Sequence, residues 1–213
     1  MKPKMYYVMD IMCGWCYSFS DVITKVYEEF KNQVDFTIVP AGMWLDKDVK
    51  KMTPGFSDFI RANNVRITQL SGKEFGQDYY FMLKDSNTVL DSFPGSKAIN
   101  VINNLENEAS FRYLKMLQEE FFINGKNMND VDVYSKVAED LGIDSDIFKK
   151  EFSSKELTDQ TFKQFNLARE LNVRSYPSLV LVNNDKISLV SSGYLPFEEV
   201  KTNVEISIGL IHR

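Results

Sequence analysis

The stretch Met12-Cys13-Gly14-Trp15-Cys16-Tyr17 contains both cysteines of this 213-residue chain. A short apolar run precedes it and apolar residues at helical spacing follow it, so the two cysteines are expected at the start of a helix. Cysteines three residues apart in that position share one face, where their sulfurs can form a disulfide. Because the loop closed by such a disulfide is very short, the bond would stabilise the fold little. The spacing therefore favours redox chemistry over a structural cross-link.

Two alternatives need no redox chemistry. The cysteines could be two small hydrophobic side chains that are neighbours in a core, or they could bind a metal ion. A structural zinc ion needs four ligands, whereas the chain has no further cysteine and a single histidine, His212, to which we assign no role. A metal site shared between two copies of the chain stays open, although no other feature indicates it. We therefore expect no bound metal and no cofactor.

The composition is that of a globular protein, with 44% hydrophobic residues and a formal net charge of -5. Nucleic-acid affinity rests on clustered Lys and Arg, so nucleic acid is not an expected partner. The N-terminal apolar run is interrupted by Asp10 and no small-residue cleavage site follows it, so no signal peptide is expected. No apolar run approaches the roughly 20 residues of a membrane span. We expect a cytoplasmic protein without a membrane partner, and no particular oligomeric state is indicated.

Periodicity predicts a β-α-β unit, a helical middle and an α-β-β-α end. Between residues 41 and 154 the pattern is helical with no convincing strand, and 73–92 gives no clear pattern. Asp130 or Asn129 is an expected helix N-cap, Gly142 an expected C-cap, and 183–186 an expected turn. The predicted strands are 5–9, 34–39, about 179–182 and 187–190. The predicted helices are 17–31, 56–70, 96–105, 111–123, 131–141, 147–152, 159–171 and 197–211.

The β-α-β start and the α-β-β-α end, separated by the helical middle, are expected to form one small mixed sheet. This gives an α/β protein with a discontinuous domain made of residues 1–45 and 155–213. Residues 46–154 would form a large inserted α-helical domain.

The first cysteine of the pair is the expected nucleophile. Unpaired backbone N–H groups and the positive end of the helix dipole favour the thiolate of Cys13, which is the attacking species in disulfide exchange. Cys16, one turn further along, would be more buried and would resolve the mixed disulfide. Gly14 would leave the nucleophile accessible, and Trp15 would offer a flat amphipathic surface beside it.

Pro177 is the other residue that stands out, because it begins an apolar strand and lacks a ladder donor. From spacing alone, a cis and a trans bond after Tyr176 are equally compatible with this position. The location of Pro177 in an α-Pro-β-β-α unit that complements the unit with the cysteine pair favours cis.

These motifs together resemble the DsbA-like branch of the thioredoxin superfamily, and within it the FrnE-like group, over nearly the full chain. The combination of a Cys-x-x-Cys motif with a distant strand-initiating proline, around a helical insert, is specific. The stretches that carry the resemblance are Asp10–Tyr17, Glu119–Gly125, Leu141–Ile143 and Val173–Leu179.

The resemblance implies a thioredoxin fold interrupted by an α-helical domain, Cys13 as nucleophile, Cys16 as resolving cysteine and Pro177 as a cis-proline opposite them. In such proteins the residue before the proline, here Tyr176, offers its backbone to an extended substrate. Two departures are visible. Ile11 occupies the position where the group's motif usually has proline. The dipeptide between the cysteines is Gly-Trp, so the histidine that helps to hold the thiolate in classical DsbA is missing. We therefore expect a less strongly oxidising pair than in classical DsbA.

The leading function is a thiol-disulfide oxidoreductase that exchanges disulfides with protein thiols or with small thiols such as glutathione. A second is a thioredoxin-fold adaptor of the protease-adaptor type, in which Trp15, Trp44 and Tyr176 line a recognition groove. A third is a glutathione-dependent isomerase or transferase similar to the kappa class. Members of that class usually carry serine in place of the cysteine pair, which counts against this reading.

Overall fold

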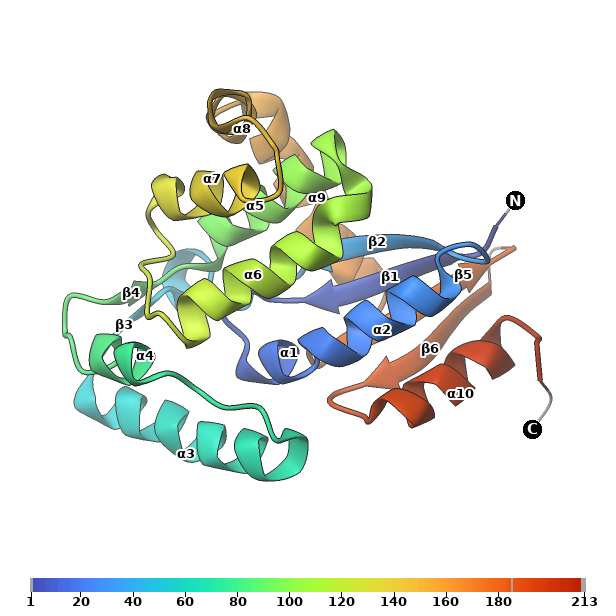
Figure 1. Ribbon diagram of the computed structural model, residues 1–213, viewed down its shortest axis with the longest axis horizontal. Coiled ribbons are helices and arrows are strands. Elements are labelled where there is room, and N and C mark those ends of the chain that lie inside the picture. Colours follow the sequence, from blue (N-terminus) through green and yellow to red (C-terminus); the bar gives the residue numbers. More distant parts are fainter. Residues whose placement is uncertain (1, 185, 212–213) are drawn as a thin grey trace.

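The computed structural model describes residues 2–184 and 186–211, and its centre is a mixed β-sheet (Figure 1). Strand β1 is parallel to β2 and antiparallel to β5, and β5 is antiparallel to β6. The strand order is therefore β2-β1-β5-β6, so both ends of the sequence contribute to one sheet, as predicted. The strand bounds are β1 Lys4–Met9, β2 Asp35–Pro40, β5 Ser178–Asn183 and β6 Lys186–Ser192.

The two faces of the sheet pack against different helices, because successive side chains of a strand point to opposite faces. Met5, Tyr7 and Met9 of β1 are fully buried in the cluster that includes α2, α6 and α10. Val8 belongs instead to the cluster that includes Ala168 of α9. Figure 1 shows α2, α6 and α10 in front of the sheet. The bounds of these helices are α2 Ser20–Phe30, α6 Ser110–Phe122, α9 Lys155–Glu170 and α10 Phe197–Ser207.

The middle of the chain is mainly helical, as predicted, and surrounds the end of the sheet where β1 stops. In Figure 1, α3 and α4 lie below that end of the sheet and α7 and α8 lie above it. The further helices are α3 Pro54–Ser71, α4 Gln77–Met82, α5 Ser92–Leu105, α7 Val131–Glu139 and α8 Ser145–Phe152, with 3-10 turns at Asp46–Asp48 and Asn107–Ala109.

The prediction of no strand in this region was wrong. Strands β3 (Lys50–Lys51) and β4 (Val89–Leu90) form a small antiparallel ladder, which the Met52 N–H extends by donating to the Thr88 carbonyl (2.9 Å). Two-residue strands are too short to give a periodic signal. The segment 73–92, which gave no clear pattern, contains β4 and the six-residue helix α4.

One of the two predicted caps of α7 is confirmed. The Asp130 side chain accepts from the Asp132 N–H (2.9 Å) and is the N-cap, as predicted. The prediction of Gly142 as the C-cap was wrong, because the helix ends at Glu139 and Asp140 is the C-cap. Gly142 follows with a positive φ of 84°, and its N–H donates to the Glu139 carbonyl (2.8 Å).

The helix predicted from 17 to 31 is divided in two. Helix α1 (Gly14–Ser18) ends at Phe19, and α2 begins at the next residue. The Ser18 hydroxyl donates to the Trp15 carbonyl (2.8 Å), which also accepts the Phe19 N–H (3.2 Å). A side chain that competes for a helix carbonyl in this way bends the helix locally.

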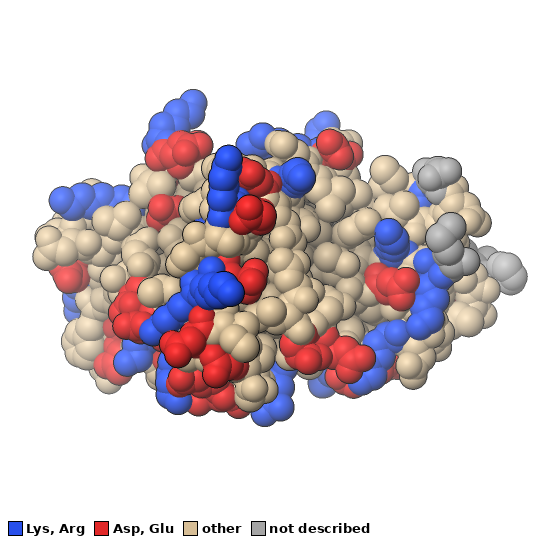
Figure 2. All heavy atoms as spheres, turned by 90° about the horizontal axis from the view of Figure 1, so that it is seen from above, with Lys and Arg blue, Asp and Glu red and all other residues tan. Residues whose placement is uncertain are grey.

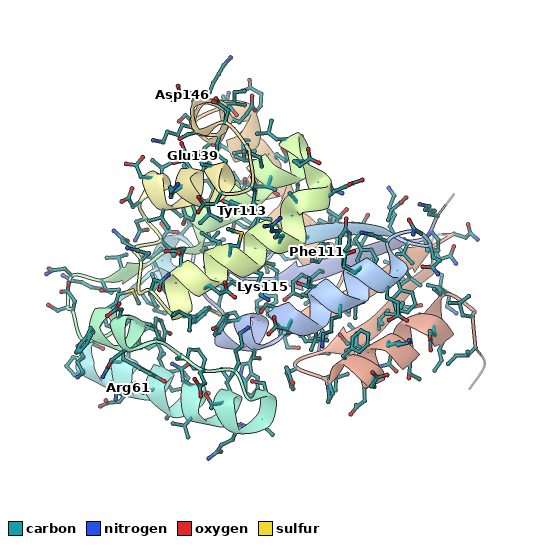
Figure 3. All side chains as sticks on the ribbon, in the orientation of Figure 1. Arg61, Phe111, Tyr113, Lys115, Glu139 and Asp146 are labelled. Carbon is teal, nitrogen blue, oxygen red and sulfur yellow. The ribbon has the colours of Figure 1, made fainter. Side chains whose placement is uncertain are left out.

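One hydrophobic cluster joins the sheet to most of the middle segment. Phe111 of α6, labelled in Figure 3, stacks on Tyr7 of β1 (ring centroids 6.2 Å apart) and on Tyr27 of α2 (4.6 Å). Two ion pairs also join the middle segment to α2. The Nζ atoms of Lys73 and Lys115 each lie 2.8 Å from a carboxylate oxygen of Asp21. The fold is the expected α/β thioredoxin fold with a large helical insertion, while the boundaries at 46 and 154 stay a prediction.

The face seen in Figure 2 carries acidic and basic side chains next to one another, without a continuous basic surface. Among the described residues, no helix has both the length and the apolar character needed to cross a membrane. His212, and Asp185 in the predicted turn, lie outside the described residues.

Candidate active site

The cysteine pair lies where β1 ends and α1 begins. Cys13 is the N-cap of α1: its backbone is extended (φ -82°, ψ 114°), and its Sγ accepts a hydrogen bond from the Cys16 N–H at 3.4 Å. The Cys13 N–H in turn donates to the Asp10 carbonyl (3.2 Å). The Cys13 sulfur therefore lies at the start of α1, and a backbone N–H of that helix points at it.

The two cysteines are free thiols with different surroundings. Cys16 is fully buried, and burial raises the pKa of its thiol well above the usual range, with the hydrogen bond to Cys13 acting in the same direction. Cys13 is 7% exposed, which is less than its expected role as an accessible attacker suggested. It lines a neighbouring pocket.

The segment 176–177 closes the site from the other end of the chain. The Tyr176–Pro177 peptide bond is cis, and the Cys13 thiol donates to the Tyr176 carbonyl across a sequence separation of 163 residues (3.9 Å). The Pro177 carbonyl is occupied, because it accepts from the Gly193 N–H (2.7 Å). Burial raises the pKa of the half-buried Tyr176 phenol, and the neighbouring Asp10 and cysteines act in the same direction.

Asp10 organises this end of the sheet, a role that was not predicted from the sequence. The carboxylate is 2% exposed and accepts from the N–H groups of Met12 (3.0 Å) and Met43 (2.8 Å). Next to it, Ser92 accepts from the Trp44 N–H (3.0 Å). Burial raises the pKa of Asp10, while the hydrogen bonds from the N–H groups of Met43 and Met12 act against the rise. The only available signal was an acidic residue inside an otherwise apolar run, three residues before Cys13.

A pocket of about 280 Å³, which we call the Cys13 pocket, opens beside the first cysteine. It lies between the start of α1, the segment 43–44 and one side of α3. Trp15 and Trp44, both named in the sequence analysis, contribute to its walls, whereas Tyr176 lies outside it. Its walls are Met12, Cys13, Gly14, Trp15, Met43, Trp44, Phe59, Ile60, Asn63, Asn64, Ile67, Tyr79, Leu90 and Phe121.

Gly14 and Trp15 connect α1 to α3. A Cβ atom at Gly14 would lie 2.8 Å from Cδ1 of the buried Ile67, so glycine permits the close packing of these helices. The ring of Trp15 is partly buried and lies below the guanidinium of Arg66, 6.0 Å from the ring centroid. The structure thus brings together all six predicted site residues, Cys13, Gly14, Trp15, Cys16, Tyr176 and Pro177.

Within residues 2–184 and 186–211 no three His, Cys, Asp or Glu side chains converge on a point that would bind a metal ion. The reactive groups at the site are the two thiols themselves. Thiol-disulfide exchange needs an attacking thiol, and a second thiol within reach can resolve the mixed disulfide, so the two cysteines supply the groups that this chemistry uses.

The sheet order and the cysteine pair facing a cis-proline define the class: a thioredoxin-fold protein with the helical insertion typical of DsbA-like members. A family model described as thioredoxin matches residues 6–201, so the chain belongs to the thioredoxin family.

Among curated proteins, the chain is similar to the ClpXP adapter protein SpxH of Halalkalibacterium halodurans, with 24% identity over 98% of this chain and 69% of that protein. It is also similar to SpxH of Bacillus subtilis, with 23% identity over 85% of this chain. The chain spans 59% of the length of the Bacillus subtilis protein.

Among solved structures, the fold resembles a Nitrosomonas europaea protein provisionally assigned as a protein disulfide isomerase, with a TM-score of 0.89, 22% identity and 99% of each chain covered. It also resembles the cytosolic disulfide reductase DsbM of Pseudomonas aeruginosa, with a TM-score of 0.79, 20% identity and 98% of this chain and 100% of that chain covered. DsbM has also been solved with glutathione. At these identities the likeness establishes the fold.

Proposed function

We propose that this protein is a thiol-disulfide oxidoreductase that exchanges disulfides with protein or small-thiol substrates through Cys13 and Cys16. The observation that carries the proposal is the position of Cys13 Sγ, which accepts from the Cys16 N–H (3.4 Å) and faces the Tyr176 carbonyl (3.9 Å). The disulfide chemistry in the names of DsbM and of the Nitrosomonas europaea protein supports the same reaction.

The exchange begins with the reduced pair. The Cys13 thiolate attacks one sulfur of a substrate disulfide, the S–S bond breaks, and the departing sulfur leaves as a thiolate that takes up a proton. Cys16 then loses its proton and attacks Cys13 Sγ, releasing the second substrate thiol and forming the Cys13–Cys16 disulfide. Two electrons pass from the pair to the substrate, and the reverse sequence oxidises a dithiol.

Trp15, Gly14, Tyr176 and Pro177 would contact the substrate, since they border Cys13 on both sides. Glutathione is a candidate thiol partner, because DsbM has been solved with it. The cytosolic location of DsbM supports the expected cytoplasmic location, where a reducing thiol pool would keep the pair reduced. The reaction as proposed uses no further cofactor, because the dithiol form of the pair supplies the two electrons and its disulfide form accepts them.

Insulin reduction by the unmodified protein with dithiothreitol tests the activity, with Cys13→Ser as the inactive control. In cells, Cys16→Ser should accumulate mixed disulfides on Cys13, which disappear when Cys13 is also replaced. The absence of both turnover and trapped mixed disulfides would reject the proposal.

A protease-adaptor function is the second candidate, and the SpxH relatives are the observation that favours it. Its test is a non-covalent pull-down with the Cys13→Ser/Cys16→Ser variant. An adaptor keeps its partner without either thiol, whereas an oxidoreductase loses its covalent partners.

A further inference from the structure

A second cavity, which we call the α3 pocket, opens at the N-terminal end of α3. It lies between the start of this helix and the segment that joins α4 to β4, and its volume is about 420 Å³. None of its wall residues belongs to the Cys13 pocket. The α3 pocket is therefore distinct from the cavity that the candidate nucleophile lines.

Two basic side chains line the α3 pocket. Arg61, labelled in Figure 3, lies on α3, and Lys84 lies on the segment after α4. Within residues 2–184 and 186–211 neither side chain forms an ion pair. The Arg61 guanidinium lies over the ring of Tyr80, 4.9 Å from its centroid, and this contact positions the cation without neutralising it. Both positive charges are therefore available to an anion.

Ser57 supplies the second, independent observation. The residue is 5% exposed and lines the pocket one helical turn before Arg61. Serines inside other helix turns, such as Ser71 and Ser96, donate to the carbonyl four residues back (2.8 and 2.7 Å). The Ser57 hydroxyl makes no such bond, nor any other with a residue that the structure describes, and its oxygen is not sealed from solvent. A nearly buried hydroxyl with free donor and acceptor capacity at a cavity wall is suited to a ligand oxygen.

Two further hydroxyl groups and the start of α3 favour the same kind of ligand. Thr53 caps α3, because its Oγ1 accepts from the Phe56 N–H (3.3 Å), and its own O–H can still donate. Ser86 adds a hydroxyl from the segment after α4. The positive end of the dipole of α3, a helix of 18 residues, lies at the same place. Donors and positive charge thus surround one cavity.

Asp58 determines which anion fits best. Its carboxylate also lines the pocket and would repel a bound anion. A carboxylate ligand carries a single charge, so the repulsion from Asp58 offsets much of its attraction to the cations. A phosphate monoester carries about -1.5 to -2 charges near pH 7 and three strong acceptor oxygens. It therefore gains more from two cations and several hydroxyl donors, and its oxygens match the fork of an arginine.

The volume and the remaining walls indicate that the ligand has an organic part. Sites for small molecules begin at about 300 Å³, and the α3 pocket exceeds that volume. Met52 and Leu83 are buried and, with Pro54, give the pocket an apolar side. Apolar surface of this kind stabilises an organic group and does nothing for a free phosphate ion.

We propose that the α3 pocket binds a small phosphate monoester, whose phosphate group contacts Ser57, Arg61 and Lys84. The organic part of the ligand lies against Met52, Pro54 and Leu83. This inference goes beyond disulfide exchange and does not depend on it, because the two pockets share no wall residue. The site binds its ligand without making or breaking a bond.

Isothermal titration calorimetry of the full chain at low salt tests the ligand class. The probes are phenyl phosphate, inorganic phosphate, benzoate and the capped peptide acetyl-glycyl-phosphoseryl-glycine amide. We expect phenyl phosphate to bind at one site with a Kd of about 1 mM or lower, and roughly tenfold more tightly than each of the other three. Added sodium chloride should weaken the binding, because it screens the two cations.

A matched pair of arginine variants tests the location. Arg61 and Arg66 are both exposed on α3, form no ion pair among the described residues and lie over an aromatic ring, but only Arg61 lines the pocket. Arg61→Gln should weaken the binding of phenyl phosphate roughly tenfold, and Lys84→Gln should do the same. Arg66→Gln should leave the Kd unchanged.

Two variants of the neighbouring wall test the roles of the hydroxyl and the carboxylate. Ser57→Ala removes one hydrogen bond to the charged ligand and should weaken binding roughly tenfold. Asp58→Asn removes the repelling charge and should tighten binding severalfold. The two single changes therefore act in opposite directions, which a general loss of structure could not produce.

Several results would overturn the inference. One is the absence of saturable binding of phenyl phosphate, and another is equal binding by Arg61→Gln and Arg66→Gln. Benzoate, inorganic phosphate or the phosphopeptide binding as tightly as phenyl phosphate would reject the ligand class, and so would an Asp58→Asn variant that binds more weakly. Arg61 and Lys84 are exposed, so their variants keep the test valid even if Ser57→Ala does not fold.

Discussion

The Sγ atom of Cys13 accepts a hydrogen bond from the backbone N–H of Cys16, 3.4 Å away, so the first cysteine caps the helix that carries the second. This contact links local structure to reactivity. The same N–H group that stabilises the start of α1 points at the sulfur that would attack a substrate.

Cys13→Ser and Cys13→Ala should both abolish disulfide exchange but should differ in stability. Serine is a good N-cap and alanine cannot accept a hydrogen bond, so we expect the serine variant to be more stable by about 1 kcal/mol. Urea denaturation of both variants, each with Cys16→Ser to exclude oxidation, measures the difference. Equal stability would show that the sulfur does not act as a cap.

Gly14→Ala should destabilise the protein, because the added methyl group would lie too close to α3. Alanine in place of glycine normally favours a helix, but here its Cβ would lie 2.8 Å from Cδ1 of Ile67, which is buried and has little room to move. We expect a loss of about 1–3 kcal/mol in the free energy of unfolding. Ile67→Val removes the obstructing atom, so the double variant should be more stable than the sum of the single effects predicts. Additive effects would mean that the two residues do not compete for space.

Asp10→Asn should change how stability depends on pH. Burial raises the pKa of Asp10 in the folded chain above its usual value of 3.8. A carboxyl group with a raised pKa gives its full stability below the unfolded value and loses it as pH rises through the folded value. The free energy of unfolding of the unmodified protein, minus that of Asp10→Asn, should therefore fall between pH 3 and pH 8. The fall amounts to about 1.4 kcal/mol for each unit by which the pKa is raised.

Urea denaturation across this pH range is the measurement for Asp10. The control is Asp58→Asn, which removes the same charge from an exposed position on α3. A difference for Asp10→Asn that increases with pH would contradict the raised pKa.

The sequence predicted the parts of the site that carry a local signal. Short-range rules recognise the spacing of the cysteine pair. They also recognise the pattern of the strand after Pro177 and of the strands around β1. The β-α-β and α-β-β-α units predicted only that the two ends of the chain share one sheet. That the segment with Tyr176 and Pro177 lies opposite Cys13, 163 residues away, was implied by the resemblance to the DsbA-like branch.

The features that were missed depend on tertiary contacts. Asn64 and Phe59 lie on a helix whose sequence does not indicate which side faces the cysteine pair. Strands β3 and β4 exist because they pair with each other across 38 or more residues, and two residues cannot carry a period. Asp10 can be buried because its carboxylate accepts hydrogen bonds from the N–H groups of Met12 and Met43, which only the folded chain brings together.

Trp15→His should make the cysteine pair more oxidising. The dipeptide Gly14-Trp15 contains no group that can place a positive charge beside the Cys13 sulfur, whereas a protonated imidazole at the start of α1 would stabilise the thiolate and hence the reduced form. We expect the unmodified pair to have a potential clearly below the roughly -120 mV of DsbA, and the variant to lie about 30 mV or more above the unmodified protein. Titration with glutathione buffers, read by the fraction of oxidised protein, gives both values. Trp15→Gln is the control for loss of the indole ring. If Trp15→His and Trp15→Gln have the same potential, charge at this position does not set the potential.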